Sequence, residues 1–222
     1  MQLTVKHIAE LLDIPERAVY DLIRKKQIPC FHIHNQYKFN RSEIKEWVLA
    51  RGIKVSNKLL LLDDSMQSIS VEELITRGGI YYDVPGETPQ EAIKNAVHVI
   101  SLPPEVNRDE VVFSLLEREE MMTTGIGRGV AIPHPRSPVI ANAEHESIAL
   151  CFLKKAIDFK ALDNEPVHVL CVVLSTKPER HVGILARLAF LFQQDDFIAL
   201  LKRRESPGVI CGYIRQKETS QH

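Results

Sequence analysis

The sequence lacks the long hydrophobic run that a membrane-spanning helix requires. No apolar stretch in its 222 residues approaches the roughly 18 residues needed to cross a bilayer, and the first residues show no signal-peptide pattern. Only four cysteines occur, far apart and without a CxxC pair, which disfavours a disulfide scaffold and a cysteine-based zinc site. These absences predict a cytoplasmic protein with free thiols and no membrane contact.

A strong net charge is also lacking, since the total is −1, but the charge is unevenly distributed. Residues 1–60 hold 11 Lys and Arg against 6 Asp and Glu, and the remaining residues hold 17 against 23. A basic first part and an acidic second part predict two domains with different partners. We expect one domain at residues 1–52, a linker at 53–68 and a second domain at 69–222.

The first of these segments has the pattern of a compact helical unit. Thr4 is an N-cap residue type, and the apolar residues after it have the spacing of one helical face. Pro15 fits the first position of a second helix that runs to about residue 26. The apolar side chains of this second helix point one way, and its opposite face carries Arg17, Tyr20 and Arg24.

A β-hairpin and a third helix are predicted to follow. Residues 31–39 alternate in polarity around the turn candidate Asn35-Gln36, which is typical of a short hairpin. Residues 40–43 have capping-box spacing and open a third helix. His32 and His34 would share one face of a strand, but no third ligand is near them in the sequence, so we expect no metal site.

This arrangement resembles the winged helix-turn-helix of the excisionase and MerR-like families. The residues that carry the resemblance lie at 3–12, 19–23 and 37–47. In such families the second helix enters the major groove of DNA and the wing contacts the DNA backbone. The resemblance therefore implies DNA contacts from four side chains, whose types suit bases and phosphates: Arg17, Tyr20, Arg24 and Lys38. A small helical module that binds a protein is the alternative.

From about residue 69, helical stretches alternate with short β-rich runs. We expect helices at 89–100, 108–120, 181–192 and 195–203, and strands at 130–132, 148–152 and 167–174. Such alternation predicts an α/β fold for the second domain.

Residues 124–134, TGIGRGVAIPH, bring three alternate glycines close to a histidine. Backbone N–H groups of such a run can approach an anion, and a neutral histidine is a nucleophile. A nucleotide-binding loop is disfavoured, because GxxxxGK[ST] and GxGxxG are absent and the run continues into a strand-like segment. The spacing alone leaves open a phosphoryl-accepting site or a turn with an incidental histidine.

Residues 116–119 and 123–134 resemble the signature of the EIIA domain, of the fructose/mannitol and nitrogen-regulatory class, in the bacterial phosphoenolpyruvate-dependent phosphotransferase system. Residues 166–170 and 181–189 also fit, so the resemblance extends from about residue 69 to the end. It implies a mixed sheet flanked by helices. It also implies that His134 accepts a phosphoryl group from an HPr-like carrier, with His181 as the second active-site histidine and Arg118 as a neutralising arginine.

Two further features of this segment concern the phosphate. The glycine spacing suggests that backbone amides of Gly127, Gly129 and Val130 bind phosphate oxygens. His134 is followed by Pro135, which has no N–H, and by Arg136, whereas many family members have a small residue directly after the histidine. Arg136 could supply a cation to the phosphate or to the carrier. No cofactor or metal is required by these residues.

The sequence thus predicts a regulator in which a DNA-binding head is joined to a phosphoacceptor domain. Phosphate on His134 would add negative charge and change a contact of the head or of a partner. One alternative is a phosphocarrier that feeds a separate EIIB component. Another is a protein-interaction regulator that does not bind DNA.

Overall fold

The computed structural model describes residues 3–25, 27–33, 36–40, 43–44, 47–48, 69–161 and 163–219. The predicted linker at 53–68, the turn residue Asn35 and the histidine His34 lie outside the described residues.

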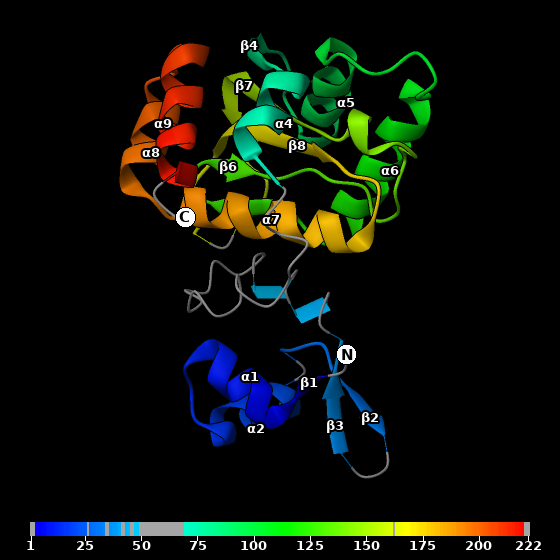
Figure 1. Cartoon of the computed structure of the whole chain (residues 1–222), viewed down its shortest axis with the longest axis vertical. Coiled ribbons are helices and arrows are strands. Elements are labelled where there is room, and N and C mark those ends of the chain that lie inside the picture. The colour runs from blue at the N-terminus through cyan, green and yellow to red at the C-terminus, as the bar shows by residue number, and fades with distance from the viewer. Residues whose placement is uncertain are drawn as a thin grey trace.

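The N-terminal unit contains β1 (Leu3–Thr4), α1 (Val5–Leu12), α2 (Glu16–Arg24), β2 (Phe31–Ile33) and β3 (Gln36–Phe39). Its three strands pair antiparallel in the order β1-β3-β2 (Figure 1). Residues 43–44 and 47–48 are helical. The predicted hairpin is confirmed. Helix α2 begins one residue later than expected, because Pro15 is its extended N-cap rather than its first helical residue.

Local hydrogen bonds and a small core hold this unit together. The Thr4 hydroxyl accepts from the His7 backbone N–H, and the His7 ring accepts from the Thr4 N–H, so a histidine completes the capping box. Ile8, Val19 and Phe39 are fully buried between the helices and the sheet. Each side chain comes from a different element, so their burial fixes the angle between helices and hairpin.

The C-terminal unit is built on a mixed sheet of five strands in the order β4-β7-β8-β6-β5. The strands are β4 (Ile80–Val84), β5 (Gly125–Gly127), β6 (Val130–Ala131), β7 (Ser147–Ile157) and β8 (Val167–Leu174). Strands β7 and β8 pair antiparallel, whereas β4 joins β7 and β6 joins β8 in parallel. The predicted mixed α/β fold is therefore confirmed.

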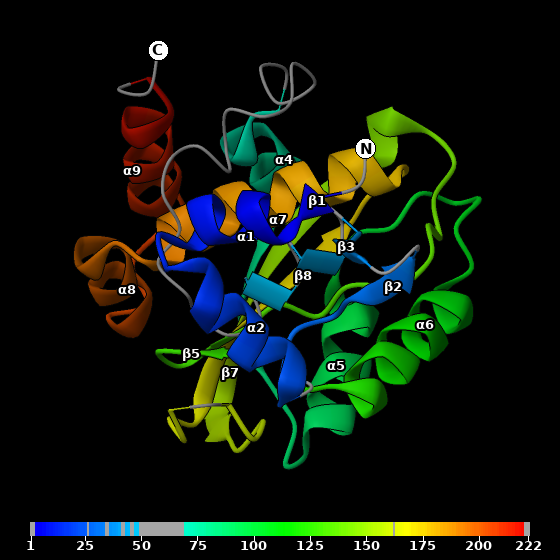
Figure 2. The same cartoon turned by 90° about the horizontal axis from the view of Figure 1, so that it is seen from below.

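Helices cover both faces of this sheet. The helices are α4 (Val71–Gly78), α5 (Pro89–Val99), α6 (Arg108–Met121), α7 (Pro178–Phe192), α8 (Asp195–Lys202) and α9 (Pro207–Thr219), with a 3-10 turn η3 at Ala143–His145. Helices α8 and α9 lie on one side of the sheet and α5 and α6 on the other (Figure 2). One buried cluster joins the sheet to α4, α7, α8 and α9, and a second joins it to α5 and α6. Alternate residues of β7 and β8 enter the two clusters, as the side-chain period of a strand requires.

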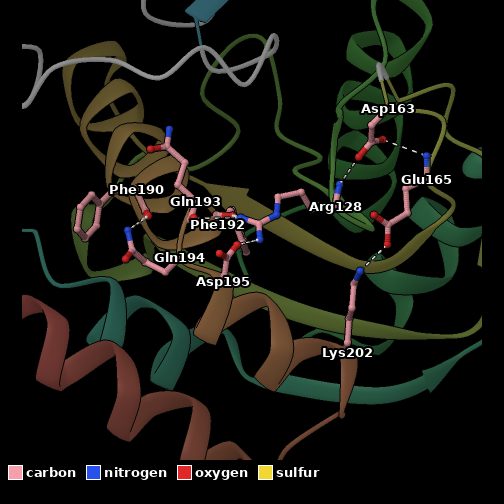
Figure 3. Close-up of polar contacts among 9 residues, drawn as sticks. All are labelled: Arg128, Asp163, Glu165, Phe190, Phe192, Gln193, Gln194, Asp195 and Lys202. Carbon is pink, nitrogen blue, oxygen red and sulfur yellow. Dashed lines mark hydrogen bonds and ion pairs between the residues drawn. The ribbon is translucent and has the colours of Figure 1, made fainter.

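The glycine-rich turn between β5 and β6 anchors this sheet edge to α7 and α8. Arg128 and Gly129 both have positive φ, 58° and 79°, as a tight two-residue hairpin turn demands. The Arg128 guanidinium reaches the carbonyl oxygens of Phe192 and Gln193, at 2.9 and 3.0 Å, and the Asp195 carboxylate (Figure 3). A cation at the carboxyl end of a helix is favourably placed against its dipole.

Gly129 allows this turn to pack, because a Cβ there would lie 2.1 Å from the His168 ring. We predict that Gly129→Ala lowers the free energy of unfolding by about 2 kcal/mol or more, through the clash and the positive φ. Gly212→Ala is the matched control, since Gly212 lies in α9 and a Cβ there would meet nothing within 4 Å. Gly212→Ala should leave the free energy of unfolding unchanged or raise it by up to about 1 kcal/mol. Urea unfolding of both variants checks this, and equal stability would contradict it.

Candidate active site around His134

His134 lies just beyond the short strand β6, in a segment that stays extended alongside β8. The Val173 N–H donates to the Pro133 carbonyl at 3.0 Å, and the Ile132 N–H donates to the Thr124 carbonyl at 2.9 Å. These bonds continue the sheet hydrogen bonding up to the histidine. The His134 side chain is only 7% exposed.

Both ring nitrogens of His134 have a partner, and together the partners define the tautomer. Nδ1 lies 2.8 Å from the backbone oxygen of Ile132. A carbonyl oxygen can only accept, so Nδ1 carries the hydrogen. Nε2 accepts a hydrogen bond from Nε of Arg118 at 3.2 Å. The lone pair of the ring therefore lies on Nε2, the nitrogen beside the guanidinium.

Arg118 is presented by the last turn of α6, and a buried carboxylate fixes the end of that helix. One guanidinium nitrogen of Arg118 donates to the Met122 carbonyl at 2.7 Å. The next residue, Glu119, is buried and accepts from the backbone N–H of Thr124 at 3.0 Å and from its hydroxyl. Glu119 thus ties α6 to the start of β5. The resemblance includes Glu119 in residues 116–119 but gives it no role, because Glu in a helix gives no local sign of such a contact.

His181 comes from the first turn of α7 and faces the His134 ring. The two ring centroids are 4.9 Å apart with an interplanar angle of 46°. Nδ1 of His181 lies 2.9 Å from Oγ of Ser175, a buried residue directly after β8. The structure thus brings together three of the predicted site residues, His134, His181 and Arg118, from three separate segments of the chain.

Burial and neighbouring charge keep both imidazoles neutral. The pKa of His134 falls to about 3, first because the ring is desolvated and then because His181 and Arg118 disfavour a positive charge. The bond to the Ile132 carbonyl opposes this fall. The pKa of His181 falls to about 4, again mainly through burial and then through Arg118. At neutral pH the site therefore offers an unprotonated nitrogen next to a permanent cation.

The predicted phosphate-binding residues Gly127, Gly129 and Val130 do not join this group. Their turn is bonded to Phe192 and Gln193, at the carboxyl end of α7, whereas His181 is near its amino end. Phe192 lies eleven positions after His181 in the same helix, and at the helical rise per residue this amounts to about 16 Å. The geometry gives these glycines a role in the packing of a hairpin turn, and phosphate binding by their amides stays a prediction.

The residues after His134 have different environments. Pro135 is buried, while Arg136 is exposed, with one guanidinium nitrogen 3.9 Å from Sδ of Met121. Met121 ends α6, the helix that carries Arg118. Arg136 therefore lies at the rim of the site, at the exposed end of α6.

The predicted DNA-contacting residues lie on α2 and β3. Arg17, Tyr20 and Arg24 are exposed on α2, and Lys38 is half-buried on β3. Arg24 forms an ion pair with Asp21. The Tyr20 ring packs edge-on against Tyr37 with centroids 6.2 Å apart, so Tyr20 contacts the hairpin as well as solvent.

The described residues form neither a metal centre nor a membrane span. Within them, no three His, Cys, Asp or Glu side chains are grouped closely enough to hold a metal ion. No helix among these same residues is long and apolar enough to cross a membrane.

Comparison with known proteins gives matches over both units. The family described as "Phosphoenolpyruvate-dependent sugar phosphotransferase system, EIIA 2" matches residues 73–217, and a helix-turn-helix domain family matches residues 3–52.

A nitrogen regulatory protein of Pseudomonas aeruginosa is 29% identical over 131 residues, which cover 58% of this chain and 83% of that protein. The fructose-specific EIIABC component of Bacillus subtilis is 28% identical over 153 residues, 68% of this chain. This chain spans only 24% of the length of that relative.

Among solved structures, the nitrogen regulatory protein IIA-Ntr of Neisseria meningitidis has the same fold in the C-terminal unit. The TM-score is 0.57 at 23% identity, over 65% of this chain and 98% of the other. With a family match over residues 73–217, the chain belongs to the EIIA 2 family of the phosphoenolpyruvate-dependent sugar phosphotransferase system, and a helix-turn-helix domain precedes its EIIA domain.

Proposed function

We propose that this protein accepts a phosphoryl group on Nε2 of His134 from a histidine-phosphorylated, HPr-like carrier. The observation that carries the proposal is the locked tautomer of His134, with its lone pair on Nε2 beside Arg118. Phosphoryl transfer needs an aligned nucleophile and charge neutralisation more than acid–base chemistry. His134 supplies the first and Arg118 the second.

The transfer balances without a proton donor or a metal. The bond between phosphorus and the carrier nitrogen breaks, and its electron pair stays on that nitrogen. The lone pair of Nε2 forms the new bond to phosphorus, while Nδ1–H remains hydrogen-bonded to the Ile132 carbonyl oxygen. Arg118 leaves Nε2 and turns to the phosphoryl oxygens, where its charge offsets theirs. The His181 ring lies next to the His134 ring, with centroids 4.9 Å apart, and holds the phosphoryl group in place.

We further propose that the head at residues 1–52 binds duplex DNA and that the phosphorylation state of His134 regulates this binding. The helix-turn-helix match, the excess of basic residues in the first 60 and the exposed Arg17 and Arg24 support this proposal. Residues 53–68 would then be the linker to an EIIA domain at 69–222. A phosphocarrier and DNA meet in the cytoplasm, where we propose the protein acts.

A second candidate function is delivery of the phosphoryl group to a separate EIIB component. The similarity to the fructose-specific EIIABC component of Bacillus subtilis favours it. Rapid loss of the phosphate to an added EIIB protein, with no effect of phosphorylation on DNA affinity, would support this candidate over regulation.

We predict that incubation with phosphoenolpyruvate, enzyme I and the cognate HPr-like carrier places one acid-labile phosphate on the protein. His134→Gln should abolish labelling. His98→Gln is the control, because His98 is an exposed histidine of α5 and should label as the wild type does. Intact-protein mass spectrometry measures the added phosphate. Full labelling of His134→Gln would contradict the assignment of the phosphoacceptor.

The pH behaviour of the site gives an independent prediction. His134 has a pKa of about 3 and His181 of about 4, so their rings stay neutral from pH 8 to about pH 5. An NMR titration should show no protonation midpoint for either ring near 6.5. Because the folded pKa values are depressed, the unfolded chain binds more protons, and stability should fall as pH drops from about 6.5 toward 4. A His134 midpoint at 6.5 would refute the burial argument.

The proposed DNA contacts of α2 give a further prediction. Arg17→Ala should weaken binding to duplex DNA. It should also reduce the slope of the logarithm of the binding constant against the logarithm of salt concentration by about one, the loss of one phosphate contact. Lys94→Ala, at an exposed position of α5 in the EIIA domain, is the control and should leave both unchanged. Fluorescence anisotropy across a salt series measures affinity and slope. Equal effects of the two substitutions would contradict an interface on α2, and equal affinity with and without phosphate on His134 would contradict regulation.

A further inference from the structure

The hydroxyl of Ser175 is buried against the second histidine of the site. Ser175 is 3% exposed, and its Oγ lies 2.9 Å from Nδ1 of His181. A hydroxyl can either donate or accept, so this contact is compatible with two tautomers of His181. In one, Nδ1–H donates to Oγ and Nε2 keeps a lone pair. In the other, Oγ–H donates to Nδ1, and the single ring proton is on Nε2.

The charge state of His181 makes this choice consequential. Burial and the nearby Arg118 hold the pKa of His181 at about 4, so the ring is neutral at physiological pH. A neutral imidazole has one N–H, and it can present either that hydrogen or a lone pair from Nε2.

A phosphoryl group on His134 distinguishes the two tautomers. It would form next to His181, since the two ring centroids are 4.9 Å apart. Its oxygens carry negative charge and only accept hydrogen bonds. Nε2–H would therefore attract the phosphoryl group, whereas a lone pair on Nε2 would repel it. We propose that Ser175 donates its hydroxyl hydrogen to Nδ1 of His181 and so keeps the ring proton on Nε2 for the phosphoryl group, an inference that rests on the proposed function of His134.

A buried carboxylate holds the serine and the histidine at this distance. The Glu146 side chain is fully buried, and one of its oxygens accepts from the Thr176 N–H and hydroxyl at 3.1 and 2.6 Å. Its other oxygen accepts from Nε of Arg180. Thr176 follows Ser175, and Arg180 precedes His181. Glu146 therefore fixes the chain next to both members of the pair, and its backbone oxygen is itself bonded to Arg77 at 2.6 Å.

The tautomer of His181 can be measured directly in the full-length protein. The 15N-labelled chain is phosphorylated on His134, either with the carrier system or with phosphoramidate, a small phosphoryl donor. Two-bond proton–nitrogen correlations then report which ring nitrogens bear hydrogen. We expect Nε2 of His181 to be protonated and Nδ1 to be unprotonated. A proton on Nδ1, or on both nitrogens, would overturn the proposal.

Variants separate a positioning role from a structural one. Ser175→Ala should speed the loss of phosphate from His134 roughly 3- to 10-fold, the size of one lost hydrogen bond, and should mix the two His181 tautomers. Ser175→Thr keeps the hydroxyl and should restore both the lifetime and the spectrum. Ser114→Ala, at a half-buried serine of α6, is the control and should match the wild type.

Thermal unfolding of each variant confirms that the fold is intact. A Ser175→Ala protein with the wild-type phosphate lifetime and tautomer would refute the inference. If wild-type His134 takes no phosphate from either donor, the proposed function fails together with this inference. If His134 is phosphorylated but His181 has the other tautomer, only this inference fails.

Discussion

The hydrogen bond from Nδ1–H of His134 to the Ile132 backbone oxygen, 2.8 Å long, determines what the site can do. Because a carbonyl oxygen only accepts, this bond puts the lone pair of the ring on Nε2, where Arg118 meets it. Burial keeps the ring neutral, so the nucleophile needs no general base. The backbone that presents the histidine thus also selects the reacting atom.

The remaining structure holds that arrangement from several sides. Strand β8 bonds to the Pro133 carbonyl, and two buried carboxylates brace the flanking segments. Glu119 fixes the end of α6 beside Arg118, and Glu146 fixes the segment that carries Ser175 and His181. Buried carboxylates are costly unless their oxygens are bonded, and here both accept from a backbone N–H and from neighbouring side chains.

Much of the fold and the candidate catalytic residues could be predicted from the sequence. Helices α5, α7 and α8 and strands β7 and β8 have clear apolar patterns, and His134, His181 and Arg118 lie in segments that resemble a known family. Strands β4 and β5 could not be predicted, because Ile80–Val84 has only one buried residue and Gly125–Gly127 is rich in glycine.

Contacts between residues far apart in the sequence set a further limit on prediction. The spacing of Gly127 and Gly129 suggested an anion site, yet Asp163 and His168 occupy the space that a Cβ would need at these positions. Ser175 and Glu146 gave no local signal, because their partners are set by tertiary packing.

The position of the phosphorus atom on the His134 ring tests the proposed tautomer most directly. Phosphorus–nitrogen couplings in the 15N-labelled, phosphorylated protein distinguish the two ring positions. We expect a phosphorus coupling to Nε2 of His134, with a hydrogen still on Nδ1. Phosphorus bonded to Nδ1 would contradict the proposed site chemistry, because that product would require the loss of the Ile132 hydrogen bond on which the site is built.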